Sequence, residues 1–487
     1  MIKLKSILLV SALALATGIA HAQDSGALLD LLVKKKVISD QEAEEVRADL
    51  VKEYTATPAG KINISAPVKE LRIYGDTRLR YEYREAQSKA NGFDTADASR
   101  FRYRLRLGLD AKLIDNWFFG LRIETSSNAR STNITMSQTT GTSNQSPAFS
   151  KSNNGIYVGQ LYLKNTPFPW LTLTGGKMPN PLVTSPMVWD PDINPEGFAQ
   201  QFKYTFGPFN GPAHTVSDGK GGKSAVEPGE PGQFTLDVFA NLGEFVYDTA
   251  APQNSFGTTS TRNDTFLFAW QAGARANFNK TTYLQVAPTF YLYSSTRNAD
   301  FKTPAATYTG MPGGQQTGIN NLEIFDIPME FDWMMADLPF RVFGEFAYNL
   351  QGSERATAAQ TAVKANIPAP KSAAENIAWQ AGFGVNKIKK KGDWEFMGYW
   401  QSSGQYALDP NLIDDDIFDA HLNMQGPVLK AGYALTDAVT FNIAYNYGII
   451  INENLGTGGS GGTMNGSTSK PAEHSYNLIQ VDLNLKF

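Results

Sequence analysis

A strict alternation of apolar and polar residues constrains the fold of this chain more than any other feature. It is clearest at residues 100–110, where the apolar positions are Phe101, Tyr103, Leu105, Leu107 and Leu109. Arg102, Arg104, Arg106 and Gly108 lie between them, and Arg100 and Asp110 flank them. A period of two places successive side chains on opposite faces of a β-strand. The alternation recurs along the chain with aromatic-rich apolar faces, which is typical of a transmembrane β-barrel.

The alternating segments begin at residue 71 and can be counted. We predict sixteen strands, at residues 71–85, 100–113, 117–127, 155–164, 170–178, 197–206, 233–243, 263–278, 282–296, 320–332, 339–352, 375–389, 393–404, 423–435, 439–453 and 474–487. Short links such as 114–116 alternate with long polar ones such as 128–154, as expected for short periplasmic turns and long external loops. The Gly/Pro-rich stretch 207–232 falls on the short-turn side and leaves the count open by one hairpin. A chain of 487 residues has the length of three soluble domains, but one large barrel uses the same length.

The N-terminal residues differ from the barrel segments. Residues 1–22 predict a signal peptide, with Lys3 and Lys5, a short apolar run and a small-residue cleavage site ending at Ala22. Residues 23–57 predict a periplasmic helical module, in which Ser39 and Glu42 have the spacing of a capping box. Residues 58–70 are expected to be a linker, and residues 71–487 the transmembrane barrel. So small a helical unit cannot bury a sufficient core alone, so we expect it to self-associate or to pack on a partner.

Composition excludes several classes of site. The chain has no cysteine, which excludes disulfide scaffolds, thiolate zinc sites and iron–sulfur clusters. A net charge of −4 argues against a nucleic-acid partner. The acidic run 414–416 lacks the glycine and spacing of a calcium loop, and we interpret it as an exposed acidic loop. Asp419 and His421 are too isolated for a persuasive catalytic pair. We therefore expect no enzyme, no cofactor and no metal site.

Charged residues on the polar faces of the strands are expected to line the lumen. The predicted basic wall consists of Arg72, Arg78, Arg80, Arg84, Arg102, Arg104, Arg106 and Arg122. The predicted acidic wall, on the opposite side of the barrel, consists of Asp326, Glu330, Asp332, Glu345 and Glu395. Two opposed walls would place a transverse field across the lumen and favour small polar solutes. The alternative is that these charges pair locally along each wall and serve only solubility.

The Pro-rich segment 176–197 is a candidate constriction loop. It reads GKMPNPLVTSPMVWDPDINPEG and is too rich in proline for a strand. Its aromatic and acidic residues could fold inward and narrow the lumen, and the candidate residues are Trp189, Asp190, Asp192 and Glu196. A plain surface loop is the alternative.

The last residues complete the pattern. Apolar residues alternate with polar ones from Ile479 to the terminal Phe487, an ending that resembles the assembly signal of outer-membrane barrel proteins. Together with the signal peptide, the start LLDLLVKKKVIS and the segment 176–197, it makes the chain resemble the putative porin family of Gram-negative outer membranes. More distantly the pattern resembles phosphate-selective porins, without a matching phosphate signature.

The resemblance implies an all-β transmembrane fold: an antiparallel outer-membrane β-barrel that passes small hydrophilic solutes or ions through a water-filled lumen. Its expected partners are outer-membrane lipid, the barrel-assembly machinery and those solutes, and a homo-oligomer such as a trimer stays open. The alternative is an anchor or adhesion barrel with a plugged lumen, and the sheath of a larger assembly is a further option.

Overall fold

A computed structural model describes residues 32–35, 38–47, 65–88, 94–126, 131–137, 155–209, 214–216, 225–227, 234–248, 264–294, 319–363, 375–457 and 473–487. The chain divides into two compact units, residues 1–66 and residues 67–487. The predicted signal peptide, residues 1–22, lies outside the described residues. No helix in the described part of the chain is both long and apolar enough to cross a membrane.

The first unit contains the predicted capping box. Residues 40–47 are helical. The backbone N–H of Glu42 donates to Ser39 Oγ at 3.2 Å, and the backbone N–H of Ser39 donates to Glu42 Oε2 at 2.8 Å. Two N–H groups that lack a partner at the start of a helix are thereby satisfied.

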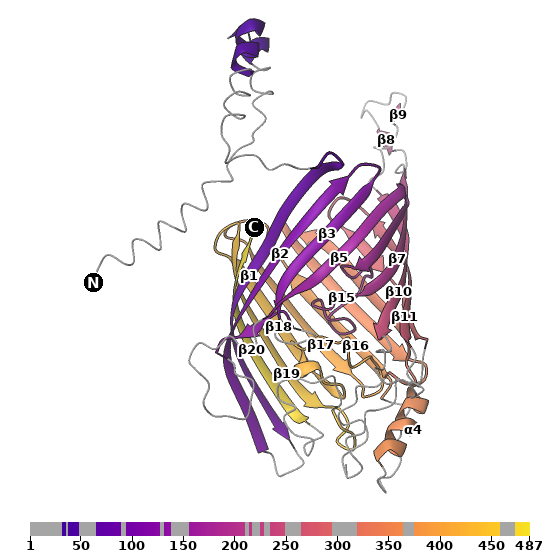
Figure 1. The fold of residues 1–487 in the computed structure, drawn as a ribbon. Helices are drawn as coiled ribbons and strands as arrows, with labels where there is room; N and C mark the ends of the chain where they lie inside the picture. Colours follow the sequence, from indigo (N-terminus) through magenta and orange to yellow (C-terminus); the bar gives the residue numbers. More distant parts are fainter. Residues whose placement is uncertain are drawn as a thin grey trace, which may run out of the picture. The chain divides into compact units, whose positions relative to one another are not determined.

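The second unit is a closed antiparallel β-barrel (Figure 1). Its wall consists of β1 Val68–Ser88, β2 Asp94–Leu113, β3 Trp117–Ser126, β5 Gly155–Phe168, β6 Leu171–Lys177, β7 Glu196–Phe209, β10 Phe234–Asp248, β11 Thr265–Asn277, β12 Tyr283–Val286, β13 Thr289–Tyr293, β14 Glu323–Met335, β15 Leu338–Asn349, β16 Ile377–Val385, β17 Trp394–Ser403, β18 Met424–Ala434, β19 Val439–Ile450 and β20 Glu473–Lys486. β1 begins at Val68, so the last residues of the predicted linker belong to the barrel.

The predicted count of sixteen strands is confirmed. β12 and β13 share one position in the wall, because both pair with β11 on one side and with β14 on the other. Pro288 lies between them and has no N–H for the ladder. The short β4, Ile134–Thr135, belongs to a loop and pairs only with β2.

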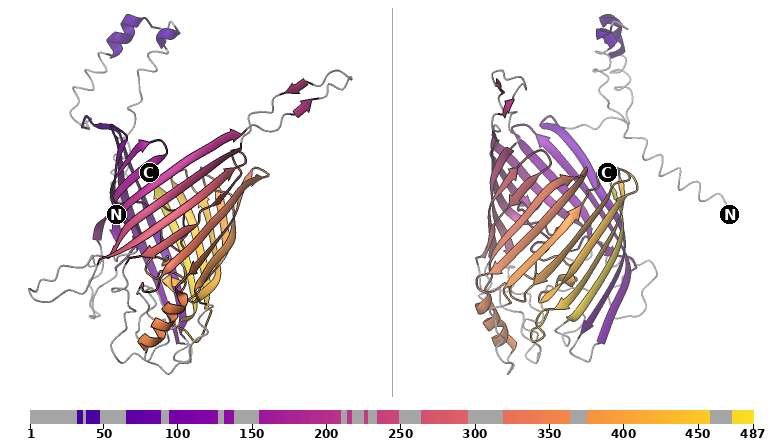
Figure 2. Two further views of the ribbon diagram at one scale, coloured as in Figure 1. Left: turned by 90° about the vertical axis from the view of Figure 1, so that its right-hand side faces the viewer. Right: turned by 180° about the vertical axis from the view of Figure 1, so that it is seen from behind.

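The long stretch after β7 does not change the count. β7 pairs directly with β10. Between them, β8 His214–Val216 and β9 Ala225–Glu227 form a separate two-stranded sheet (Figure 2). The stretch is therefore a long insertion at the end of the barrel that otherwise carries short turns.

The barrel closes where the first strand meets the last. β1 pairs with β20 in the register Thr77↔Leu485 and Arg80↔Asp482. At this seam Arg80 Nε donates to Asp482 Oδ1 at 2.7 Å, and Arg78 Nε donates to Asn484 Oδ1 at 2.9 Å. The backbones of Phe487 and Gly75 exchange two hydrogen bonds of 3.0 and 3.1 Å.

The two faces of the wall carry opposite chemistry. Ile73 and Phe101 face outward and are each 60% exposed, whereas the inward Arg80 is 4% exposed. Apolar residues outside and polar residues inside invert the arrangement of a soluble protein, as expected when lipid is the outer solvent. Trp117, Trp170 and Trp394 are exposed beside short turns, where an interfacial belt is expected.

Two long loops fold into the interior. Loop 178–195 joins β6 to β7, and loop 404–423 joins β17 to β18. Met187 and Trp189 of the first loop share one buried apolar cluster with Leu408 and Leu412 of the second and with Phe245 of the wall. The core of this molecule thus lies inside the barrel and holds both loops there. The helix α4, Gly352–Val363, lies in the connection between β15 and β16 (Figure 1).

Candidate functional site

A ladder of arginines covers the inner face of β1 and β2. Arg78 lies directly opposite Arg104, and Arg80 lies opposite Arg102. Since the alternation of both strands is in phase, the arginines of the two strands share one face. Like charges opposite one another across a ladder are destabilising, so the arrangement requires acids nearby.

Those acids come first from the same wall. The Glu82 carboxylate is completely buried and lies 2.7 Å from Arg84 Nε, 2.5 Å from Arg100 and 3.4 Å from Arg102. The Asp76 carboxylate lies 2.7 Å from both Arg104 and Arg106. Each of these carboxylates therefore separates neighbouring guanidinium groups.

Loop 404–423 supplies further acids. Arg80 Nη1 donates to both oxygens of Asp416, at 2.9 and 3.0 Å, and Gln480 Nε2 donates to Asp416 Oδ1 at 2.6 Å. Arg84 Nη1 donates to Asp419 Oδ1. Burial opposes ionisation of Asp416, but the charges of Arg80 and Arg84 outweigh it and hold the Asp416 pKa well below its usual range.

Loop 178–195 meets both the ladder and the other loop. Asp192 lies 3.5 Å from Arg106 and accepts a hydrogen bond of 2.9 Å from Thr132 Oγ1. The Asp190 N–H donates to the Leu412 carbonyl at 2.6 Å. Burial, followed by the charges of Asp414 and Asp415, raises the pKa of Asp190 to about 10. Burial together with the Asp416 charge raises the pKa of Asp414 to about 7.

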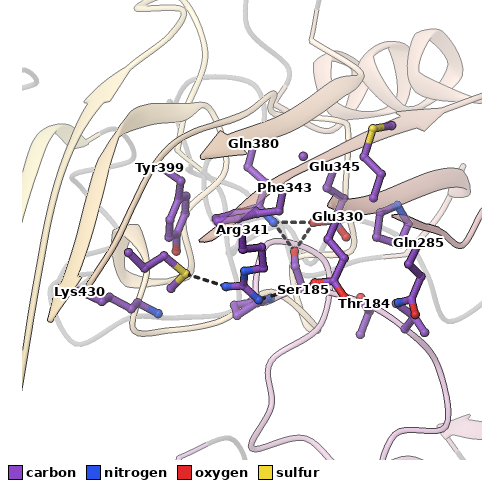
Figure 3. A pocket seen from close by; sticks show the side chains of 16 residues that line it. Thr184, Ser185, Gln285, Glu330, Arg341, Phe343, Glu345, Gln380, Tyr399 and Lys430 are labelled. Carbon is purple, nitrogen blue, oxygen red and sulfur yellow. Dashed lines mark hydrogen bonds and ion pairs between the residues drawn. The ribbon is translucent and has the colours of Figure 1, made fainter. Parts of the chain in front are cut away.

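The predicted acidic wall is divided among several environments. Glu345 is 4% exposed and accepts hydrogen bonds from Ser185 of loop 178–195 and from Gln380 (Figure 3). Asp326 is fully buried. Glu330 lies 3.6 Å from Arg341, and Asp332 lies 2.6 Å from Lys387. Basic residues of the same wall thus neutralise part of its acidity.

Two cavities lie between the wall and the loops. The larger has a volume of about 650 Å³, and its charged lining is Arg78, Arg80, Arg104, Arg106, Asp190, Asp192, Arg341, Lys387, Glu395, Asp414, Asp415, Asp416, Lys430 and Asp482. The smaller has a volume of about 240 Å³ and lies between loop 178–195 and strands β12 and β14 to β18. Figure 3 shows Arg341 and Lys430 beside Tyr399 in this smaller cavity, with Glu345 and Ser185 farther along its wall.

Only some of the residues predicted for the two walls line the larger cavity. Of the predicted basic wall, Arg78, Arg80, Arg104 and Arg106 line the larger cavity, and of the predicted acidic wall only Glu395 does so among the described lining residues. Arg84 and Arg102 are buried in ion pairs, and Arg122 pairs with Glu124 at 2.8 Å. Arg72 is exposed, with its guanidinium over the Tyr74 ring.

The four candidate residues of the constriction loop also lie in different environments. Asp190 and Asp192 line the larger cavity. Trp189 is 4% exposed, packs against Phe245 and donates through Nε1 to the Ile193 carbonyl. Glu196 is the first residue of β7 and pairs with Lys177 at 2.8 Å near the surface. The segment therefore folds inward, whereas Glu196 lies near the surface.

Sequence reasoning missed the acids of loop 404–423. The interpretation of 414–416 as an exposed acidic loop is wrong, because Asp414 is 8% exposed and Asp416 pairs with Arg80 inside the barrel. The only sequence signal was a run of three aspartates, and nothing local distinguishes a buried run from a solvated one. Arg341, Lys387 and Lys430 of the larger cavity, each within a predicted strand, were also missed.

The chain is similar to several solved structures and to one family model. No curated protein matches it. Three solved structures that resemble it are OmpT, an outer membrane protein of Vibrio cholerae (13% identity, TM-score 0.39, 87% of this chain and 100% of that chain), OprB of Pseudomonas putida (11%, 0.43, 86% and 94%) and the outer membrane channel DcaP of Acinetobacter baumannii (12%, 0.39, 88% and 99%). A family model described as "Putative porin" matches residues 89–318. The predicted resemblance to the putative porin family is thereby confirmed over residues 89–318.

Proposed function

We propose that the barrel is a passive diffusion channel for small hydrophilic solutes or ions. The observation that carries this proposal is the cavity of about 650 Å³, which lies inside a closed barrel and is lined by charged side chains from strands and loops. A cavity lined with so many ionised groups holds water, because charges that lack solvation or partners are costly to bury. A hydrated passage of this kind admits polar solutes and disfavours apolar ones.

We further propose that the selectivity field lies between the arginine ladder and the inward loops. Arg78, Arg80, Arg104 and Arg106 stand on one side of the larger cavity, and the aspartates of the two loops approach them from within. Glu345 is covered by Ser185 of loop 178–195 and Asp326 is fully buried, so their charges reach the larger cavity only weakly. The acidic partner of the ladder is thus assigned mainly to the loops, with Glu395 as the contribution of the opposite wall.

A plugged anchor barrel is the second candidate. It is favoured by one observation: the side chains of Leu408 and Phe418 in loop 404–423 are completely buried inside the barrel. A loop that fills the whole cross-section would leave no conducting path. The two functions differ in one measurable property, the conductance of the inserted protein.

We assign the remaining parts by the same proposal. Residues 1–22 direct export and are removed, and residues 23–57 remain in the periplasm and mediate oligomerisation, such as a trimer, or contact with the cell wall. Phe487 acts as the signal for the barrel-assembly machinery, and the protein performs no catalysis. Deleting residues 23–57 is expected to change oligomer size or envelope attachment. An unchanged size and attachment would contradict the role given to this module.

The experiment that tests the channel is a recording of the purified protein in a planar bilayer under a salt gradient. Discrete open steps are expected, and the sign of the reversal potential reports which charges dominate the passage. Reproducible insertion without conductance would favour the plugged anchor barrel instead.

A further inference from the structure

We infer that a divalent cation of the calcium type binds between the two inward loops, on the carboxylates of Asp190, Asp414 and Asp415. Each of these residues offers one carboxylate oxygen, and the three oxygens lie within 4.8 Å of one another. Calcium binds oxygen ligands at about 2.3–2.6 Å, so two oxygens on one ion are separated by at most about 5 Å. The cluster therefore has the dimensions of a coordination shell.

A second observation points to a missing ligand at this place. Asp190 is only 2% exposed. Its Oδ1 accepts a hydrogen bond of 2.8 Å from the Asp192 N–H, while its buried Oδ2 has no hydrogen-bond partner in the described part of the chain. A buried carboxylate oxygen without a partner is costly and calls for an explanation such as an ion.

Nearby aspartates show how the same interior treats other carboxylates. Asp416 is neutralised by Arg80 at 2.9 Å, and Asp192 lies 3.5 Å from Arg106. Among the described residues, no such ion pair joins Asp190 or Asp414 to a basic side chain, although Lys430 lines the same cavity. Three ionised carboxylates brought together repel one another unless a cation lies between them or a proton neutralises one of them.

The chemistry of the ligands selects the class of ion. All three are carboxylates, which hard cations prefer, whereas zinc sites usually contain nitrogen or sulfur ligands. The ligands come from two loops of irregular backbone, which suits the variable geometry of calcium better than the strict octahedron of magnesium. All three aspartates line the larger cavity, from which water could complete the coordination shell.

The site would act as a clamp between the loops. The loops already contact each other through two backbone hydrogen bonds, Asp190 N–H to Leu412 O at 2.6 Å and Asp414 N–H to Pro186 O at 3.1 Å. A bound cation adds a link that involves only side chains and holds both loops at the larger cavity. This inference does not depend on solute transport, because cation binding is measured directly.

The test uses terbium as a luminescent substitute for calcium. Full-chain protein is refolded in detergent micelles free of lipopolysaccharide, and folding is checked by heat-dependent mobility in gels. Trp189, which precedes Asp190 in the sequence, is expected to sensitise terbium emission on excitation of the indole. We expect saturable emission from one site, reversed by calcium and strongly reduced in Trp189→Phe.

Three further variants make the result decisive. Asp190→Asn and Asp415→Asn keep the side-chain shape, remove one ligand charge each and are expected to weaken terbium binding at least tenfold. Glu395→Gln removes a charge from the same cavity outside the cluster and is expected to leave binding unchanged. Absence of saturable emission in the wild type, or equal binding by wild type and both aspartate variants, would overturn the inference. The first of these results would mean that the cluster is neutralised by a proton rather than by a cation.

Discussion

Replacing Asp416 by Asn is expected to release loop 404–423 from the arginine ladder. Asp416 joins this loop to β1 through two hydrogen bonds from Arg80 and to β20 through a hydrogen bond from Gln480. Asn keeps the size of the side chain but removes the charge and leaves Arg80, which is 4% exposed, without this anion. Breaking a buried charge pair costs about 3–5 kcal/mol.

The lower end of that range applies here, because the Asp416 side chain is 26% exposed and Arg80 keeps Asp482. A loss of about 3 kcal/mol shifts the equilibrium between docked and released loop by roughly 150-fold. Single-channel recording in a planar bilayer is the assay. The variant is expected to fluctuate between conductance levels far more often than the wild type. Glu395→Gln is the matched control, because it removes one charge from the same cavity without removing a tether. Identical conductance levels and dwell times in Asp416→Asn and wild type would refute the reasoning.

Three other outcomes are expected. Replacing Arg104 and Arg106 together by Gln removes two positive charges from the larger cavity, so the reversal potential in a salt gradient should move toward cation preference; no movement would remove the ladder from the selectivity proposal. Gly426→Ala would place a Cβ 1.8 Å from a backbone carbonyl oxygen of β19 and is expected to lower stability by at least about 2 kcal/mol, read as loss of the folded band in heat-modifiability gels. Gly344→Ala, whose Cβ would meet no atom closer than 3.5 Å, is the control and should remain folded; equal losses would contradict the packing argument. Deleting Phe487 removes the two hydrogen bonds that its backbone exchanges with Gly75 of β1 and should reduce the amount of folded barrel in the outer membrane. An unchanged amount would argue against a role of Phe487 in assembly.

The strands could be predicted because each residue in the wall has one of two environments. Lipid lies on one side and water or polar side chains on the other, so the alternation at Phe101, Arg102 and Tyr103 encodes both the strand and its facing. The same reasoning predicted an inward phase for Arg80 and Glu345, and each is 4% exposed.

The partners of these residues could not be predicted in the same way. Arg80 and Asp416 are 336 residues apart in the sequence, and their contact depends on how loop 404–423 folds back into the barrel. Glu345 was predicted to line the lumen as part of the acidic wall, but Ser185 of loop 178–195 covers it. Periodicity reports on which side of the wall a residue lies, and it contains no information about which loop returns to meet it.

The seam between β1 and β20 contains charged pairs that favour one strand register when the barrel closes. A register shift of two residues would keep every side chain on its correct face. Contact of the apolar side chains with lipid would therefore not disfavour it. In either direction, however, such a slip separates Arg80 from Asp482, and in one direction it places Arg78 opposite Lys486. Charge pairing across this seam thus disfavours the register that places Arg78 opposite Lys486, which hydrophobicity alone would accept.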